Sequence, residues 1–155
     1  MSAVDRPTAG QDDPLRLALH LCFALHNTSR AFDAVYRHVL RDIGLTYPQY
    51  LAMLTLWEHG DLTVKEIGTR LRLDSGTLSP LLKRLEAAGL ITRERSTSDE
   101  RSVVIRLTAA GEDLREPARE VPDKIAAAAG LEADEARTLS DILQRLTQSL
   151  DAAVN

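Results

Sequence analysis

The sequence predicts a mainly α-helical protein with one small β-hairpin. Apolar residues recur at helical spacing through most of the 155 residues. Aromatic residues make up only 4%, fewer than the strands of an all-β protein require. Hydrophobic residues at 44% and charged residues at 27% are ordinary for a globular chain and exclude global disorder. The length fits one domain, or one domain with an appended arm.

The N-terminal part predicts a polar tail followed by one long helix. Residues 1–13 are polar and acidic without apolar periodicity, which predicts a mobile tail. Asp13 can cap a helix, and Pro14 suits the first helical position. Apolar residues then recur until Gly44, which predicts a helix over residues 14–43. A length of about 30 residues exceeds the ~10–14 of a typical globular helix and indicates an element shared between two subunits.

The middle of the chain predicts a winged helix-turn-helix. Pro48 opens one helix, Thr63 caps the next, and Gly89 closes a third. Two short runs rich in β-branched residues follow, joined by the polar loop 96–101, which is typical of a hairpin. The order of helix, turn, helix and hairpin is that of a winged helix-turn-helix. The expected elements are helices at 48–59, 65–71 and 77–88, a short extended piece at 62–64, and strands at 90–95 and 102–107.

The last part of the chain predicts two amphipathic helices. Thr108 caps a helix that bends at Pro117 and Pro122 and ends near Gly130, and residues 134–153 form the second. The apolar faces of this last helix and of the first helix are larger than the small middle domain can cover. The simplest way to bury them is against a second copy, which predicts a two-fold homodimer.

Basic residues are concentrated in the predicted winged segment. Between Val64 and Arg106 there are nine basic and six acidic residues, a net charge of +3, whereas the whole chain carries -4. A basic module in an acidic chain is typical of phosphate binding, because released counterions supply much of the affinity. The charge alone would equally fit a solvated face. Together with the helix-turn-helix order, it indicates double-stranded DNA as a partner.

The predicted recognition helix starts at Ser75. Its short hydroxyl side chains allow close approach to the major groove, and Lys83 and Arg84 could reach guanine edges or the backbone. In the hairpin loop, Arg101 is placed to enter an adjacent minor groove. Arg101 could also form an ion pair with Asp99 or Glu100 that shapes the loop, and the two roles can coexist. The predicted DNA-binding residues are Asp74, Ser75, Thr77, Ser79, Pro80, Lys83, Arg84, Asp99 and Arg101.

Several stretches of the sequence resemble MarR-family regulators. Residues 99–108, Asp-Glu-Arg-Ser-Val-Val-Ile-Arg-Leu-Thr, resemble the wing signature of that family. Residues 73–86 and 44–51, together with Leu-Cys-Phe-Ala-Leu at 21–25, resemble its organic-hydroperoxide-sensing branch, OhrR. The match runs from about residue 15 to residue 108, and the C-terminal helices agree only in length and character.

The resemblance implies a MarR-like homodimeric repressor. The reduced protein would bind a palindromic operator, and oxidation of a first-helix cysteine by an organic hydroperoxide would release the DNA. That cysteine maps to Cys22, and the two tyrosines that hydrogen-bond to it from the partner subunit map to Tyr36 and Tyr47. A third position of the thiol pocket, usually tyrosine, is His26 here. The chain has one cysteine, so the resemblance is to the one-cysteine type, whose sulfenic acid persists or condenses with a small cellular thiol.

Other interpretations of these residues remain open. A free cysteine is more often a buried core residue than a sensor, judged from its position alone. With Cys22 inert, the protein would be a MarR-type repressor released by a non-covalent small molecule. A thiol-dependent peroxidase of the peroxiredoxin kind would need threonine and arginine around its cysteine. Cys22 lacks that environment, and the chain has no resolving cysteine, so we expect no enzymatic activity. An architectural DNA-binding protein is disfavoured by the scarcity of lysine in the recognition helix.

The sequence predicts a cytoplasmic protein without cofactor or metal. No apolar run approaches the ~20 residues that span a bilayer, and the N-terminus lacks the layout of a secretory signal. Cys22 and His26 could form a metal-binding pair, but His20 and His38 are not in step with them and the chain has no second cysteine, so we expect no four-ligand zinc site. The predicted divisions are a mobile tail (1–13), a first helix for dimerisation and sensing (14–43), a winged helix-turn-helix (44–107) and C-terminal dimerisation helices (108–155).

Overall fold

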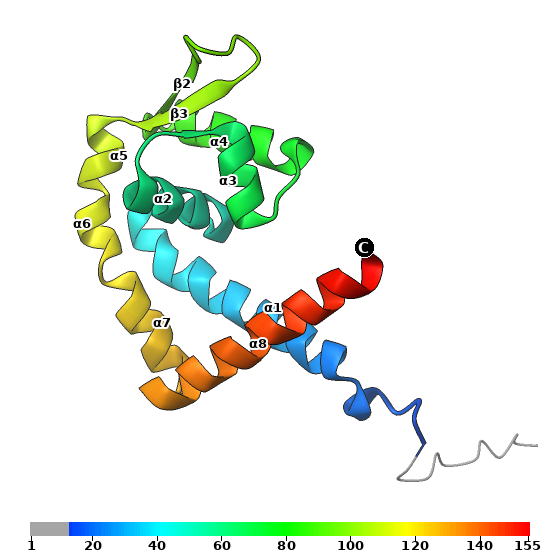
Figure 1. Cartoon of the computed structure of the whole chain (residues 1–155). Helices are drawn as coiled ribbons and strands as arrows, with labels where there is room; N and C mark the ends of the chain where they lie inside the picture. The colour runs from blue at the N-terminus through cyan, green and yellow to red at the C-terminus, as the bar shows by residue number, and fades with distance from the viewer. Residues whose placement is uncertain (1–12) are drawn as a thin grey trace, which may run out of the picture.

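A computed structural model describes residues 13–155 and shows a mainly helical chain with one small sheet at one end (Figure 1). The predicted tail falls on residues 1–12, outside the described part of the chain, and on Asp13. Helices α2, α3 and α4 pack with the sheet in one module, and the remaining helices extend from it. The elements of this module are α2 (Tyr47–His59), β1 (Leu62–Thr63), α3 (Val64–Leu71), α4 (Ser75–Ala87), β2 (Ile91–Arg95) and β3 (Val103–Leu107).

The module confirms the predicted winged helix-turn-helix. Strands β2 and β3 form the expected antiparallel hairpin, with Ile91 opposite Leu107. The short strand β1 adds a third strand beside β3, so the sheet order is β1-β3-β2. The sequence analysis had not assigned that pairing. The core is mainly aliphatic, with Tyr50 and Trp57 as its buried aromatic residues. Its largest fully buried side chains are Leu40, Met53, Leu56, Ile67, Leu78, Leu82, Leu85, Ile91 and Ile105.

Local side-chain caps explain where the helices of the module begin. The Thr46 hydroxyl accepts a hydrogen bond from the backbone N–H of Gln49, whose side chain accepts one from the N–H of Thr46. Thr63 and Glu66 form the same reciprocal arrangement at the start of α3. Such boxes satisfy backbone donors that a helix leaves unpaired, so they define the first turn.

The first helix differs from the prediction at its start. It consists of a short 3₁₀ turn, η1 (Leu17–Leu19), then α1 (Leu21–Val39), then a second 3₁₀ turn, η2 (Leu40–Ile43), which ends at Gly44 as expected. Asp13 does cap, but it caps a turn, because its carboxylate accepts the N–H of Leu15. The leucines of this segment alternate at every second residue and all are exposed. An α-helix over this segment would place these leucines on several of its faces, and none of those faces would be buried against the rest of the chain.

The C-terminal half confirms the predicted bends. Three short helices descend from the sheet: α5 (Ala109–Asp113), α6 (Arg115–Ala118) and α7 (Val121–Ala129). Gly130 follows in the left-handed conformation, and α8 (Ala133–Val154) completes the chain. The side chain of Trp57 in α2 donates a buried hydrogen bond to the carbonyl oxygen of Gly111 in α5, with the two atoms 3.0 Å apart. This bond joins the winged module to the C-terminal helices.

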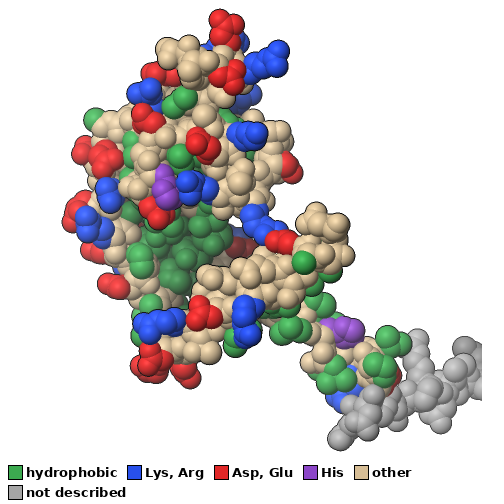
Figure 2. Space-filling model, in the orientation of Figure 1, with side chains coloured by type: hydrophobic (Ala, Val, Ile, Leu, Met, Phe, Trp, Pro, Cys, Tyr) green, Lys and Arg blue, Asp and Glu red, His purple; other side chains and the backbone are tan. Residues whose placement is uncertain are grey.

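Helices α1 and α8 leave their apolar stripes uncovered within one chain. Within the described chain, neither helix has a buried residue. On α8, Leu139 is 42% exposed, Ile142 45% and Leu150 60%. Figure 2 shows hydrophobic side chains at the surface of the part of the molecule that projects away from the winged module. No helix in residues 13–155 is long and apolar enough to cross a membrane.

Candidate nucleic-acid interface and thiol site

Helix α4 presents polar and basic side chains on one face and buries leucines on the other. Leu78, Leu82 and Leu85 are buried against the module core. The opposite face carries the predicted recognition residues: Ser75, Thr77, Pro80, Lys83 and Arg84 are exposed, and Ser79 is half-buried. The structure therefore gathers these residues on one accessible face.

Asp74 precedes this face and caps the helix. Its carboxylate accepts a hydrogen bond from the backbone N–H of Thr77 at 2.7 Å. That hydrogen bond lowers the pKa of Asp74 below its ordinary value of 3.8. Asp74 thus holds the first turn of α4 in place, whatever it contacts on DNA.

The wing loop is shaped by Asp99. Its carboxylate accepts a hydrogen bond from the backbone N–H of Arg101 at 3.0 Å, and its carbonyl oxygen accepts one from the N–H of Ser102. No ion pair of the Arg101 guanidinium is found among residues 13–155. The alternative of a loop-shaping ion pair is therefore replaced by a backbone contact, and Arg101 stays exposed.

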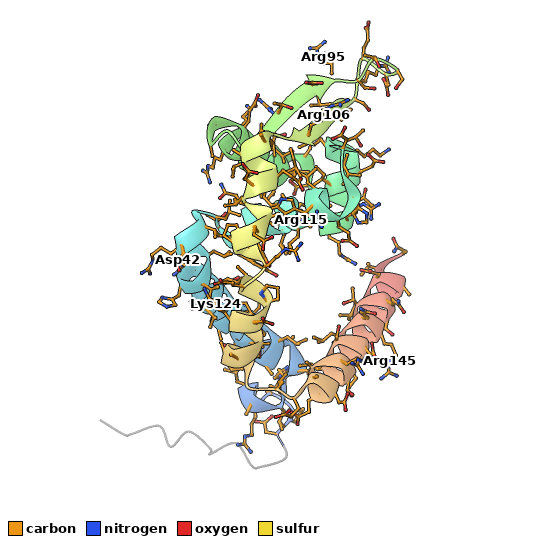
Figure 3. The ribbon with its side chains drawn as sticks, turned by 90° about the vertical axis from the view of Figure 1, so that its left-hand side faces the viewer. Asp42, Arg95, Arg106, Arg115, Lys124 and Arg145 are labelled. Atoms are coloured by element: carbon orange, nitrogen blue, oxygen red, sulfur yellow. The ribbon has the colours of Figure 1, made fainter. Side chains whose placement is uncertain are left out.

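Three of the nine basic residues of the winged segment are engaged inside the protein. Arg93 pairs with Glu86 on α4, and Arg106 pairs with Asp61 at 3.1 Å and Glu94 at 3.4 Å. Figure 3 shows Arg106 on the sheet and Arg95 toward the wing. Arg72 pairs with a residue of α8. Because these three arginines already pair with carboxylates of the same chain, the cations left for an outside partner are fewer than the sequence count suggests.

An open hollow of about 730 Å³ lies between α3, α4 and the wing. Hydroxyl and basic side chains dominate its polar lining, which includes Thr69, Ser75, Ser79, Arg93 and Arg101. The recognition helix and the wing thus border one concavity, whose polar groups are mostly hydroxyl and basic side chains. Such a surface suits the phosphate and base-edge contacts of a DNA groove.

Cys22 is exposed in the first turn of α1. His26 lies one helical turn further along and is also exposed, so the two residues share a face of the helix. The interpretation of Cys22 as a buried core residue is wrong for the single chain. In the described part of the protein, no group of three or more histidine, cysteine, aspartate or glutamate side chains is arranged to hold a metal ion.

Three tyrosines cluster where α1 meets α2. The rings of Tyr36 and Tyr47 stack with centroids 4.3 Å apart, and Tyr50 lies 6.0 Å from Tyr36. Burial raises the pKa of all three phenols above 10.0, and the negative charge of Asp33 adds to the rise at Tyr47. The phenols therefore keep their protons at neutral pH and are available as hydrogen-bond donors.

Tyr50 and Asp33 are members of this cluster that the sequence analysis missed. Tyr47 and Tyr50 are three residues apart in a helix, so their common face could have been inferred. The approach of Asp33 to Tyr47 depends on how α1 packs on α2, and no local pattern gives it.

The thiol and the tyrosines are not brought together within one chain. Cys22 and Tyr36 stand fourteen residues apart in the same helix, α1. At 1.5 Å per residue their backbones are roughly 21 Å apart. Any contact between them therefore requires a second copy of the protein.

Comparison with known proteins identifies the family. The sequence profile of the MarR family matches residues 45–103. Over 138 residues, the chain is 46% identical to the organic hydroperoxide resistance transcriptional regulator of Bacillus subtilis, covering 89% of this chain and 94% of that protein. The chain belongs to the MarR family. It is also 48% identical to the regulator TtmR of Methylorubrum extorquens, over 92% of this chain and 73% of that protein. Both predictions, the MarR family and its organic-hydroperoxide branch, are confirmed.

Solved MarR-family structures share the fold. Reduced AbfR bound to DNA superposes with a TM-score of 0.76 at 41% identity, covering 90% of this chain and 96% of that one. AbfR is also known in an overoxidised form bound to DNA, with a TM-score of 0.72 at 41% identity over 87% of this chain and 95% of that one. The protein is thus a MarR-family transcriptional regulator with a winged-helix fold.

Protonation of three capping and pairing carboxylates should destabilise this regulator in acid. Hydrogen bonds lower the pKa of Asp74 and Asp151 below 3.8 and that of Glu66 below 4.5. A lowered folded-state pKa stabilises the fold above the unfolded-state value, and this contribution disappears as pH falls through the folded-state value. We expect urea unfolding, followed by circular dichroism, to show a stability that falls below about pH 4.

Two variants test whether the capping carboxylates cause this acid dependence. The double variant Asp74→Asn with Glu66→Gln should show a shallower decline in stability than wild type. Asp113→Asn, in which the replaced carboxylate lies exposed on α5, should keep the wild-type decline. Equal slopes in all three proteins would show that these caps do not set the acid response.

Proposed function

We propose that the protein is a redox-sensing transcriptional repressor. As a homodimer it binds operator DNA while Cys22 is reduced, and it releases the DNA when an organic hydroperoxide oxidises Cys22. The observation that carries this proposal is the position of the chain's single cysteine, exposed on the uncovered helix α1 and distant from the protonated tyrosines of the same chain. The DNA-bound AbfR structures and the name of the Bacillus relative support the partner and the effector. For a protein that binds operator DNA, we expect a cytoplasmic location.

A two-fold dimer would complete the thiol site. If the α1 helices pair antiparallel, the start of one helix meets the end of the other. A two-fold axis near residue 29, midway between Cys22 and Tyr36, sets each thiol beside the partner's tyrosine cluster. The same arrangement would cover the apolar stripes of α1 and α8, which one chain leaves exposed.

The reaction at this site is a thiol oxidation. Phenol O–H groups of Tyr36 and Tyr47 from the partner chain hydrogen-bond to the sulfur and favour the thiolate. The thiolate attacks the distal oxygen of the hydroperoxide, so that an S–O bond forms and the O–O bond breaks. The alkoxide leaves and takes up a proton to become the alcohol, while Cys22 becomes a sulfenic acid. A small thiol can then condense with it, forming a mixed disulfide and releasing water.

The site is connected to the recognition helix through α2. Tyr47 and Tyr50 belong to α2, and α2 packs against α3 and α4. An adduct on Cys22 that displaces the tyrosines therefore moves the helix on which the module rests. Operator half-sites lie about 34–36 Å apart, so a shift of a few ångströms between the two recognition helices weakens binding.

Mixed dimers test whether the thiol site is shared between subunits. A Cys22→Ser chain and a Tyr36→Phe chain are co-expressed with different tags and purified as the heterodimer. Its one remaining thiol faces an intact Tyr36 only across the interface, so it should react with cumene hydroperoxide at the wild-type rate. The Tyr36→Phe homodimer should react about tenfold more slowly, because the sulfur loses a hydrogen bond that favours the thiolate.

The reciprocal heterodimer is the control. A wild-type chain paired with a Cys22→Ser/Tyr36→Phe chain keeps Cys22 and Tyr36 in one chain and loses the contact across the interface. We expect its thiol to react slowly. Fast reaction in this heterodimer and slow reaction in the first would contradict a shared site.

A further inference from the structure

One ion pair ties the end of the C-terminal helix to the winged module. The guanidinium of Arg72 donates two hydrogen bonds to the carboxylate of Asp151, each at 2.8 Å. The partners are separated by 79 positions in the sequence. Paired hydrogen bonds between a planar guanidinium and a carboxylate fix orientation as well as distance.

Arg72 stands in the turn that gives the helix-turn-helix its angle. It is the C-cap of α3 and comes two residues before Asp74, the N-cap of the recognition helix α4. Among the described residues it is the only non-glycine residue with a positive φ, at 55°. Glycine is the usual residue for this conformation at a helix end. Unlike glycine, an arginine at this position has a side chain, and that side chain reaches Asp151 on α8.

Little else holds the end of α8 to the module. The hollow between Arg72 and α8 is lined mainly by polar side chains, among them Ser140, Gln144, Thr147 and Gln148. The other approach of α8 is to α1, where Leu139 and Phe32 border a small apolar hollow. In the part of the chain that the structure describes, the Arg72–Asp151 pair is therefore the specific contact between the C-terminal end of α8 and the helix-turn-helix.

We infer that Arg72 and Asp151 are a positioning pair, through which α8 sets the orientation of the recognition helix. This inference rests on the proposed DNA-binding function. The pair connects α8, a helix expected at the dimer interface, directly to the turn before α4. This connection does not pass through α2, the helix that would link the thiol site to α4. Arg72 then acts on DNA affinity through Asp151, without touching a phosphate.

The deciding variant is Asp151→Asn, because simple electrostatics predicts the opposite result. Removing a negative charge should strengthen DNA binding if the charge acts only through space. If Asp151 positions the turn, Asp151→Asn should instead weaken binding, by about fivefold for an exposed pair. Arg72→Gln should weaken it similarly, and the double variant should be no worse than either single variant. The exchange Arg72→Asp with Asp151→Arg should restore part of the affinity.

The measurement is fluorescence anisotropy with a duplex that the wild-type protein has selected from a random-sequence library, over a range of salt concentrations. Asp134→Asn is the matched control, since Asp134 pairs with Arg137 at the far end of α8 and carries the same charge. It should bind as wild type does. Thermal unfolding of each variant checks that the fold is retained.

The salt dependence separates positioning from direct contact. A positioning role leaves the slope of log affinity against log salt unchanged in Arg72→Gln. A lost phosphate contact reduces that slope by about one. Wild-type or tighter binding by Asp151→Asn, a reduced slope in Arg72→Gln, or additive effects in the double variant would overturn the inference. Failure of the wild-type protein to select any duplex would instead overturn the proposed function.

Discussion

Replacing Cys22 by serine is expected to abolish release of DNA by organic hydroperoxide while leaving DNA affinity within about twofold of wild type. Cys22 is exposed on α1 and remote in sequence from the recognition helix, so the substitution removes no core contact of the chain. A serine hydroxyl stays protonated at neutral pH and does not attack a peroxide, whereas a thiolate does. Because the chain has one cysteine, no second thiol can substitute for it.

The experiment compares hydroperoxide titrations of the DNA complex. Cys22→Ser should stay bound at every dose that releases the wild-type protein. Ala24→Ser introduces the same hydroxyl on the same turn of α1, at an exposed position, and should respond as wild type does. A Cys22→Ser protein that is released normally would exclude the thiol mechanism.

Replacing Gly111 by alanine is expected to cost about 3–5 kcal/mol of unfolding free energy, among the largest effects of a single methyl group. An added Cβ would stand 2.0 Å from the carbonyl oxygen of Leu90 and 3.2 Å from a methyl group of Leu107. The backbone of Gly111 cannot retreat, because its N–H bonds to the Thr108 hydroxyl and its carbonyl oxygen accepts the Trp57 side chain. Relief of the clash must therefore break the connection between the winged module and α5.

Chemical denaturation followed by tryptophan fluorescence measures this effect, since Trp57 is the chain's only tryptophan and reports on the same connection. Gly76→Ala is the control. Its Cβ would meet only the Asp74 carboxylate at 3.3 Å, and alanine favours a helix by up to about 1 kcal/mol. A Gly111→Ala protein as stable as wild type would show that α5 can move without loss.

The elements of the fold were predictable where their signals are local. Thr63 with Glu66, and Thr108 before α5, are caps that act over three residues, so the sequence places these helix starts. The start of α1 was predicted wrongly, because Asp13 and Pro14 are equally good signals for an isolated turn. Strand β1 is two residues long and exists through its pairing with Ile105, a contact that no local pattern contains.

The same distinction between local signals and distant contacts applies to the candidate sites. The exposed face of α4 follows from helical periodicity and could be predicted. The assignment of Cys22, Tyr36 and Tyr47 came from the family resemblance, since their distance along the chain gives no reason to associate them. Ion pairs such as Arg72 with Asp151 depend on the packing of distant helices, and the sequence shows only two ordinary charged residues.

The most direct test of the account follows DNA binding by the wild-type protein through one redox cycle. Fluorescence anisotropy on the selected duplex is measured before and after one equivalent of cumene hydroperoxide, with and without a small thiol, and again after excess dithiothreitol. The account predicts a loss of binding on oxidation that dithiothreitol reverses. Binding that persists with both hydroperoxide and thiol would contradict it, and would leave a MarR-family regulator whose effector is a non-covalent ligand.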